Sequence, residues 1–301
     1  MELLDIAVFS DVHGNDCALQ ACVDYCMGKG ITKYILLGDY ISDCPGVQKT
    51  MELIYVLKKY FECYIVRGNR EEYMLSYRKN GQTGWDKGSG SGSLLYTYEQ
   101  LTEKDLDFFE SLPIYGIWNP KGGQGFEYCH GSPTGVSELL FGEKRSTKRV
   151  LNKMRTNILL HGHTHVQESF SYREKRAVNP GALGLPRNRN CDAEFAIIHS
   201  GRTGWEEELV QVKYDRHGIL KSFQSSGLME YAPAWAAVTM HTIRSGVDLS
   251  ESILLQAMKL CEEDRGIVRW PNIPEMYWAE ALKLNYIDLS GKDIPRPKKR
   301  V

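Results

Sequence analysis

The sequence has no long apolar run and almost no net charge, and each absence excludes a class of protein. No stretch of the 301 residues approaches the roughly 18 consecutive apolar residues that a membrane-spanning helix needs, so we expect no membrane span. The formal net charge of −1 argues against a partner that is a nucleic-acid polymer, because such binding depends on a basic surface. A small anionic ligand stays compatible, since a local site can be positive on a neutral protein.

The eight cysteines also lack a pattern, which argues against a disulfide framework and favours a reducing compartment. Cys17, Cys22 and Cys26 cluster and could hold zinc, but they lack the C-x2-C pairing that zinc sites favour. We interpret them as small apolar residues on a helix face. The first residues, MELLDIAVFSDVHGN, contain no basic region typical of a secretory signal. We therefore predict a cytoplasmic protein.

What the sequence does contain is an alternation of strand-like and helix-like segments. Apolar segments at 3–10, 33–39 and 62–69 predict buried strands, and segments of helical spacing at 15–28 and 46–60 lie between them. This order is typical of an α/β sheet that is at least partly parallel and is covered by helices.

The later part of the chain predicts further strands and then a helical region. A capped helix is expected at 102–113, and residues 86–93, DKGSGSGS, are interpreted as a surface connection rather than a mobile flap. Strands and turns follow, and from about residue 225 the apolar period is helical. We predict two regions, residues 1–224 and a helical appendage with a basic tail at 225–301. Trp235, Trp270, Tyr277 and Trp278 are interpreted as aromatic core residues of this appendage.

Three of the eight histidines lie within five positions, in ILLHGHTHV at 158–166. On a strand, residues two apart point to the same face, so His163 and His165 could reach one point. By itself the segment is compatible with a structural histidine cluster, a metal site or acid–base catalysis by one imidazole.

Similar side chains follow four other predicted strands, and they favour the metal site. The complete set of candidate ligands is Asp11, His13, Asp39, Asn69, His130, His163 and His165. Ligands of open α/β sheets bind at the carboxyl ends of strands, so these side chains would converge. The mixture of carboxylate, imidazole and amide oxygen suits Mn, Fe, Co, Ni or Zn better than Mg or Ca. Seven ligands are too many for one ion with an open position, and they match two ions that share a bridge.

Taken in order, the motifs D-x-H, G-D, G-N, H-G and G-H-x-H resemble the signature of the calcineurin-like metallophosphoesterases. The segment VNPGALGLPR is similar to an N-P-G-S-x-G-x-P-R segment of the small bacterial phosphodiesterase-like branch. The resemblance covers roughly residues 5–215. It implies an α/β fold, a four-layer α/β/β/α sandwich around a dinuclear metal centre, to which the C-terminal helical appendage is added.

The resemblance also divides the ligands between two divalent ions, with Mn expected and Fe, Zn, Ni or Co as alternatives. The first ion would be held by Asp11, His13 and His165. The second would be held by Asn69, His130 and His163, with Asp39 as the bridge. His161 has no ligand role in the family pattern.

One position departs from the pattern: many members carry a histidine after the G-N pair, where this chain has Arg70. Arginine stays protonated and cannot act as a general acid, but its guanidinium can clamp a phosphate oxygen. The alternative is an ion pair with Glu71, Glu72 or another acid. Arg187, in GLPR, is either a second phosphate contact or an ion-pair residue. Members without the histidine resemble phosphodiesterases.

We therefore expect a phosphodiesterase for a small phosphate-ester substrate, with Asp39, Asn69 and Arg70 as catalytic residues and a metal-bridging hydroxide as nucleophile. A phosphomonoesterase, a protein Ser/Thr phosphatase and a dinucleoside polyphosphate hydrolase are alternatives, although their relatives usually carry the missing histidine. A non-catalytic metal-binding scaffold, like the similar retromer subunit, is an alternative of another class. The appendage could cap the site, form a homo-oligomer contact or bind a partner.

Overall fold

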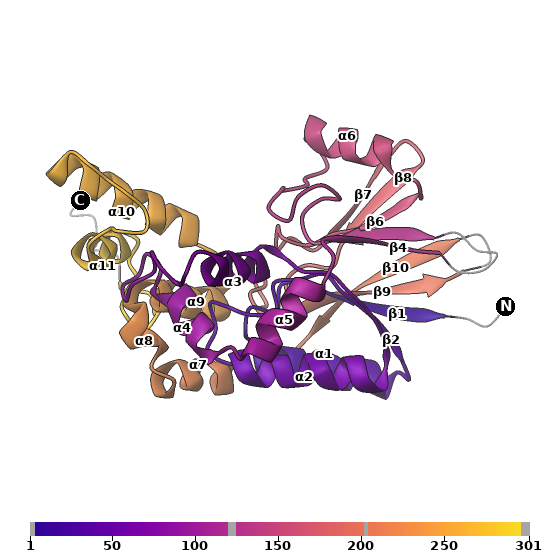
Figure 1. Cartoon of the computed structure of the whole chain (residues 1–301), viewed down its shortest axis with the longest axis horizontal. Coiled ribbons are helices and arrows are strands. Elements are labelled where there is room, and N and C mark those ends of the chain that lie inside the picture. The colour runs from indigo at the N-terminus through magenta and orange to yellow at the C-terminus, as the bar shows by residue number, and fades with distance from the viewer. Residues whose placement is uncertain (1–3, 120–124, 202–203, 296–301) are drawn as a thin grey trace.

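The computed structural model describes residues 4–119, 125–201 and 204–295, and within them two five-stranded sheets face each other (Figure 1). The first sheet has the order β10-β9-β1-β2-β3 and the second the order β4-β5-β6-β8-β7. The strands are β1 (Asp5–Phe9), β2 (Lys33–Leu36), β3 (Glu62–Ile65), β4 (Tyr115–Trp118), β5 (Phe126–Cys129), β6 (Ile158–Leu160), β7 (Glu168–Tyr172), β8 (Lys175–Asn179), β9 (Ala193–Ser200) and β10 (Trp205–Val212).

Each sheet has a parallel centre and at least one antiparallel edge. In the first sheet β1, β2 and β3 are parallel, with Ala7 opposite Tyr34. Strand β9 is antiparallel to β1, and β10 is antiparallel to β9. In the second sheet β5, β6 and β8 are parallel and β4 and β7 are antiparallel to their neighbours. The carboxyl ends of the parallel strands of each sheet consequently share one edge.

Alternating side chains hold the layers together. On β1, Ile6 and Val8 pack between the sheets, while Ala7 and Phe9 pack on the helical side. A strand that is buried on both faces reads as a continuous apolar run, which is why the sequence predicts these strands clearly. In the second sheet Leu159 faces away from the first sheet and packs in a small core under the helix Arg145–Lys153.

The helices cover the outer faces of both sheets, so the predicted four-layer sandwich is confirmed (Figure 1). Helices α1 and α2 lie along one outer face and α6 lies over the other. The helices are α1 (Asp16–Gly28), α2 (Val47–Tyr60), α3 (Asn69–Lys79), α4 (Gly92–Gln100), α5 (Glu103–Ser111), α6 (Arg145–Lys153), α7 (Arg216–Ser225), α8 (Leu228–Tyr231), α9 (Pro233–Ser245), α10 (Ser250–Arg265) and α11 (Glu275–Leu284). None of the helices in the described ranges is long and apolar enough to cross a membrane.

The cysteine cluster behaves as the sequence predicts. Cys17, Cys22 and Cys26 lie on α1 as free thiols, and Cys22 and Cys26 are buried in the main core. Burial raises the pKa of Cys26 to about 12, so this thiol is a neutral apolar side chain at ordinary pH.

Two interpretations of the later chain are corrected. The segment 86–93 is more than a surface connection, because its last residues begin α4 and Ser89, Ser91 and Ser93 are buried. Trp270 is not a core residue, since 52% of it is exposed and it precedes α11.

The C-terminal helices divide between two cores. Helix α7 begins at Arg216, and its Ile219 and Phe223 pack in the core shared with α1 and α2. Helices α10 and α11 pack with one face of α9 in a separate cluster centred on the fully buried Trp278. The division of the chain at residue 224 stays a prediction.

Candidate metal centre

All seven candidate ligands follow strands, and they come from both sheets. Asp11 and His13 follow β1, Asp39 follows β2 and Asn69 begins α3 directly after β3. The second sheet contributes three histidines. They are His130 after β5 and His163 and His165 after β6. The centre therefore lies where the carboxyl ends of the two sheets meet.

The backbone at these ligands is unusual. Five candidate ligands have positive φ, the left-handed region that side chains other than glycine rarely adopt. They are Asp11 (55°), His13 (50°), Asp39 (54°), His163 (67°) and His165 (56°). Such conformations cost roughly 1–3 kcal/mol each and persist where the surroundings determine them, typically at functional sites.

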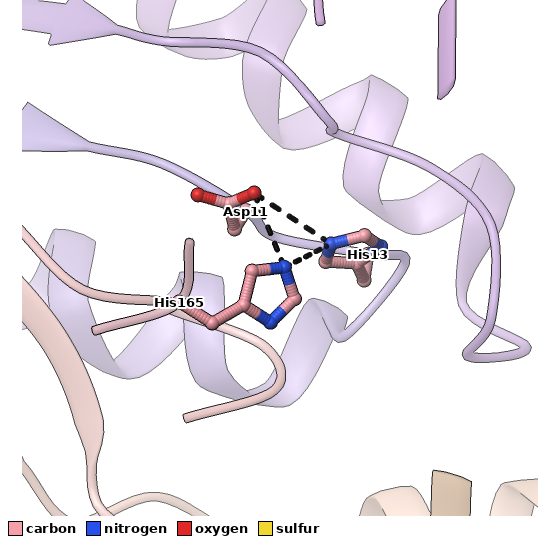
Figure 2. A group of neighbouring side chains, drawn as sticks. All are labelled: Asp11, His13 and His165. Carbon is pink, nitrogen blue, oxygen red and sulfur yellow. Dashed lines mark hydrogen bonds and ion pairs between the residues drawn. The ribbon is translucent and has the colours of Figure 1, made fainter. Parts of the chain in front are cut away.

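The first group of ligands, Asp11, His13 and His165, points its polar atoms at one spot (Figure 2). The Nε2 atoms of His13 and His165 are 3.0 Å apart. The Oδ1 atom of Asp11 lies 3.3 Å from Nε2 of His165 and 3.8 Å from Nε2 of His13. This oxygen is buried and, within the described ranges, accepts no hydrogen bond. Two imidazole nitrogens beside an unpartnered carboxylate oxygen make three ligand atoms that fit a metal ion.

The second group comprises Asp39, His130 and His163. Nε2 of His130 lies 3.2 Å from Nδ1 of His163 and 3.4 Å from Oδ2 of Asp39. Oδ1 of Asn69 lies 3.0 Å from the same His130 nitrogen. Oδ2 of Asp39 is also 3.8 Å from His13, so this carboxylate lies between the two groups.

The outer nitrogens of two histidines have hydrogen-bond acceptors that fix their rings, and that of a third, His13, has an ion-pair partner. Nδ1 of His130 donates to the carbonyl oxygen of Leu37 at 3.0 Å, and Nδ1 of His165 donates to that of Leu185 at 3.2 Å. Nδ1 of His13 lies 2.9 Å from Oδ2 of Asp43. Partners of this kind orient a metal-binding imidazole and leave its Nε2 lone pair free for the ion.

Asp43 is a functional residue that the sequence analysis missed. It is 3% exposed, and besides His13 it contacts Nη2 of Arg70 at 3.0 Å and accepts from Nε1 of Trp235 at 2.7 Å. Arg70, His13 and Trp235 hold its pKa well below the usual range although burial alone would raise it. An acid in the loop four residues after a metal-binding Asp was the available signal.

The pKa values of the side chains in the centre are shifted because carboxylates and imidazoles lie close together there. Burial opposes charge at Asp39, but His130 and His13 lower its pKa to about 2. The same attraction outweighs burial at His13 and His130 and raises the pKa of each to about 9. Burial and the nearby His130 lower the pKa of His163 to about 4. Metal ions would displace the protons, because only neutral imidazoles and ionised carboxylates bind them.

Arg70 lies beside the centre, and neither of its predicted glutamate partners is correct. The carboxylate of Glu71 accepts from the backbone N–H groups of Gly68, Asp39 and Tyr40, and Glu72 pairs with Arg67. The guanidinium of Arg70 pairs with Asp43, so the alternative of an ion pair with another acid is the one found.

Two groups fix Asp39, the carboxylate that lies between the two candidate ligand groups. Its Oδ1 accepts from the backbone N–H of Arg70 at 2.8 Å. A side chain at Gly68 would collide with this carboxylate, since an added Cβ would lie 2.2 Å from Oδ1. The glycine of the G-N motif is therefore required by the close approach of Asp39.

Arg187 contacts Oδ2 of Asp248 at 2.6 Å and lines a cleft of about 530 Å³ above the centre. Residues of α9 and α10 form the opposite wall of this cleft, including Trp235, Thr239 and Glu251. The described chain thus places the appendage over the metal-binding side chains.

Asn179, at the start of the segment NPGALGLPR, supports the histidine loop. The Nδ2 of Asn179 donates to the carbonyl oxygen of Gly162 at 3.0 Å and to Oγ1 of Thr164 at 2.9 Å. His161 is buried with Nδ1 3.4 Å from Asn179, so it contacts this support and not the ligand groups.

Known proteins resemble this chain in sequence and fold. Residues 4–202 match the Calcineurin-like phosphoesterase superfamily domain. The uncharacterized protein MJ0912 of Methanocaldococcus jannaschii is 29% identical over 228 residues, which cover 70% of this chain and 88% of that protein.

Two solved structures have the same fold. Hypothetical protein PH1004 of Pyrococcus horikoshii superposes with a TM-score of 0.67 and 21% identity, covering 81% of this chain and 99% of that one. A metallophosphoesterase of Sphaerobacter thermophilus superposes with a TM-score of 0.64 and 22% identity, covering 81% of this chain and 99% of that one. Because the family match spans more than half of the sequence, the chain belongs to the calcineurin-like phosphoesterase superfamily and is a metallophosphoesterase, a hydrolase of phosphate esters.

Proposed function

We propose that the chain is a phosphodiesterase that hydrolyses a small phosphodiester with two divalent ions, with Mn as the expected metal. One observation carries the proposal: two groups of three ligands open on one cleft, and a buried oxygen of Asp11 between them has no hydrogen-bond partner in the described ranges. Asp11, His13 and His165 would hold one ion, and Asn69, His130 and His163 the other, with Asp39 shared. Bound ions would supply Lewis acidity and an acidified water as nucleophile.

The residues around the ligands supply orientation and charge. Asp43 and the two backbone carbonyls hold the imidazoles in place. Arg70 keeps its backbone N–H on Asp39, while its buried Nε has no hydrogen-bond partner among the described groups. This Nε can donate to a phosphate oxygen and stabilise the charge that develops on it.

The absence of a histidine at position 70 favours a diester with a good leaving group. Arginine cannot protonate the departing oxygen, so the proton must come from water. Aryl oxides leave without such help, whereas alkyl oxides need it. The alternatives within the class, a phosphomonoesterase, a protein Ser/Thr phosphatase or a dinucleoside polyphosphate hydrolase, are disfavoured for the same reason.

The reaction would take place in the cytoplasm. All eight cysteines are free thiols, which supports a reducing compartment.

The test compares hydrolysis of bis-p-nitrophenyl phosphate and p-nitrophenyl phosphate by the Mn-loaded protein and by Asp39→Asn. We expect the diester to be preferred, and we expect the variant to lose at least 100-fold in kcat/KM because the shared carboxylate is gone. Asp24→Asn, an exposed acid of α1, is the matched control and should react like the wild type.

Two results would contradict the proposal. Preference for the monoester would favour a phosphatase and a different role for Arg70. Protein that binds no divalent ion in mass spectrometric metal analysis would exclude the two-metal reaction.

A further inference from the structure

A second cavity of about 170 Å³ adjoins the cleft above the metal centre. The two share four lining residues. They are Asp43, Arg70, Tyr73 and Trp235. The rest of its wall comes from the 89–94 segment and from the appendage, which contributes Trp270 and Trp278. A group held in this cavity therefore lies directly beside the phosphate position.

The cavity has aromatic walls in a fixed arrangement. The rings of Trp235 and Trp278 meet edge to face at 6.3 Å between centroids, and Nε1 of Trp235 donates to Asp43. The opposite wall is fixed by Ser89, whose backbone N–H and hydroxyl donate to the carboxylate of Glu275, and whose Oγ accepts from the N–H of Ala234. Half-exposed Trp270 lies at the rim.

Three residues that line this cavity carry a buried polar atom without a hydrogen-bond partner in the described ranges. The Nε1 of Trp278, the Oγ of Ser93 and the Nε of Arg70 are buried, and none makes a hydrogen bond within the described ranges. Trp278 is 0% exposed and Ser93 is 5% exposed. Buried polar groups are nearly always hydrogen-bonded in native proteins, because leaving them unpaired is costly. Tryptophan and arginine can only donate, so the missing partner must carry acceptors.

The size of the cavity limits the partner to one ring. A cavity of about 150 Å³ with apolar walls is enough to bind benzene. Aromatic walls favour a flat ring that can pack against their faces or edges. A purely hydrocarbon ring is excluded, because it would leave the Nε1 of Trp278 and the Oγ of Ser93 unpaired while the Nε of Arg70 donates to the phosphate.

We propose that this cavity is a specificity subsite for a planar, uncharged ring of pyrimidine size with carbonyl or ring-nitrogen acceptors, carried by one ester group of the substrate. The inference rests on the proposed phosphodiesterase function, which supplies the phosphate position. It narrows the substrate class to phosphate esters in which one ester group carries such a ring. A pyrimidine nucleoside ester has this chemistry. The Arg70 side chain lines both compartments, and thus connects recognition of the ring to the phosphate.

The test is binding of thymidine 5′-monophosphate against 2-deoxyribose 5-phosphate, which lacks the base, measured by calorimetry on the Mn-loaded full chain. We expect the base to strengthen binding at least tenfold. Ser93→Ala should reduce this ratio about fivefold, the value of one hydrogen bond, and should leave binding of the deoxyribose phosphate unchanged. Trp278→Phe, which removes the N–H and keeps an aromatic ring, should act in the same direction.

Tyr98→Phe is the matched control. It removes another buried hydroxyl without a partner from the same helix α4, outside the cavity, and should leave the ratio unchanged. Thermal unfolding separates a structural effect from recognition. Removing an unpartnered hydroxyl should not lower the stability of Ser93→Ala, so a loss of base discrimination at unchanged Tm reports the subsite.

Each outcome decides one of the two proposals. Equal binding of the two compounds, or a ratio that Ser93→Ala does not change, overturns the subsite while diester hydrolysis can still stand. A preference for the base that Ser93→Ala reduces, in protein that hydrolyses neither ester of p-nitrophenol, supports the subsite and overturns the phosphodiesterase.

Discussion

At the residue scale, the candidate metal centre is held in shape by side chains outside the proposed ligand set. Asp43 joins the ligand His13, the cleft residue Arg70 and, through Trp235, the helical appendage. One buried carboxylate thereby joins a candidate metal ligand to the walls of both cavities. Glu71 holds the backbone in place in a similar way. Its carboxylate accepts hydrogen bonds from the N–H groups of Gly68, Asp39 and Tyr40, and so fixes the position of Asp39.

Asp43→Asn should weaken metal binding more than it weakens the fold. Outer partners of metal-binding histidines are worth about 10–100-fold in affinity, so we expect a loss of that size in titrations of the metal-free protein with Mn. Asp105→Asn, a buried acid that caps α5 far from the centre, serves as the control. An Asp43→Asn protein with wild-type Mn affinity would contradict the orienting role.

Glu194, on β9, should make the stability depend on pH. It is 3% exposed, its Oε2 has no hydrogen-bond partner in the described chain, and burial raises its pKa from 4.5 to about 7. The folded protein therefore holds this proton more tightly than the unfolded chain does. The resulting stability is complete below about pH 4.5 and is lost as the pH rises towards 7.

Glu194→Gln stays neutral and should be more stable than the wild type above pH 7, by on the order of 2 kcal/mol, with a smaller difference at pH 5. Urea unfolding at both pH values measures this. The exposed Glu206→Gln should show no such change. A difference between Glu194→Gln and wild type that is the same at both pH values would show that the carboxyl group does not titrate as described.

At the element scale, the success of sequence reasoning follows the apolar pattern. Strands β1, β2 and β3 and helices α1 and α2 bury continuous or periodic apolar residues, and they were predicted within a few residues. Helices α3 and α6 were missed because they bury few apolar side chains. Among the residues of α6 only Thr147 and Leu151 are buried.

The site divides in the same way. The convergence of the candidate ligands could be predicted because each follows a strand in a short motif. The contacts of Asp43 and Glu71, and the cavity behind Arg70, could not. They join segments far apart in the sequence, as in the hydrogen bond between Trp235 and Asp43. The local pattern of apolar residues carries no information about such pairs.

At the scale of the whole molecule, the metal centre joins the two sheets, and bound metal should therefore stabilise the entire fold. Asp11, His13, Asp39 and Asn69 follow strands of the first sheet, while the remaining three histidines follow strands of the second. In the metal-free protein the side chains of these candidate ligands repel one another or bind protons. Five of them also keep a left-handed backbone conformation, which is energetically costly. Ions bind the folded state alone, because the unfolded chain does not assemble the ligands.

Addition of Mn to metal-free protein should consequently raise Tm in a concentration-dependent way. At about 100 times the Kd the gain in stability is about 2.7 kcal/mol, which corresponds to roughly 4 °C for a chain of 301 residues. Differential scanning calorimetry with and without chelator measures it, and Mg should produce a smaller shift because it disfavours imidazole ligands. Asp39→Asn should lose most of the Mn effect, since it removes the carboxylate that lies between the two ligand groups. An equal rise for wild type and Asp39→Asn would mean that Mn stabilises the protein at some other place, and the two sheets would then be held together by their apolar interface alone.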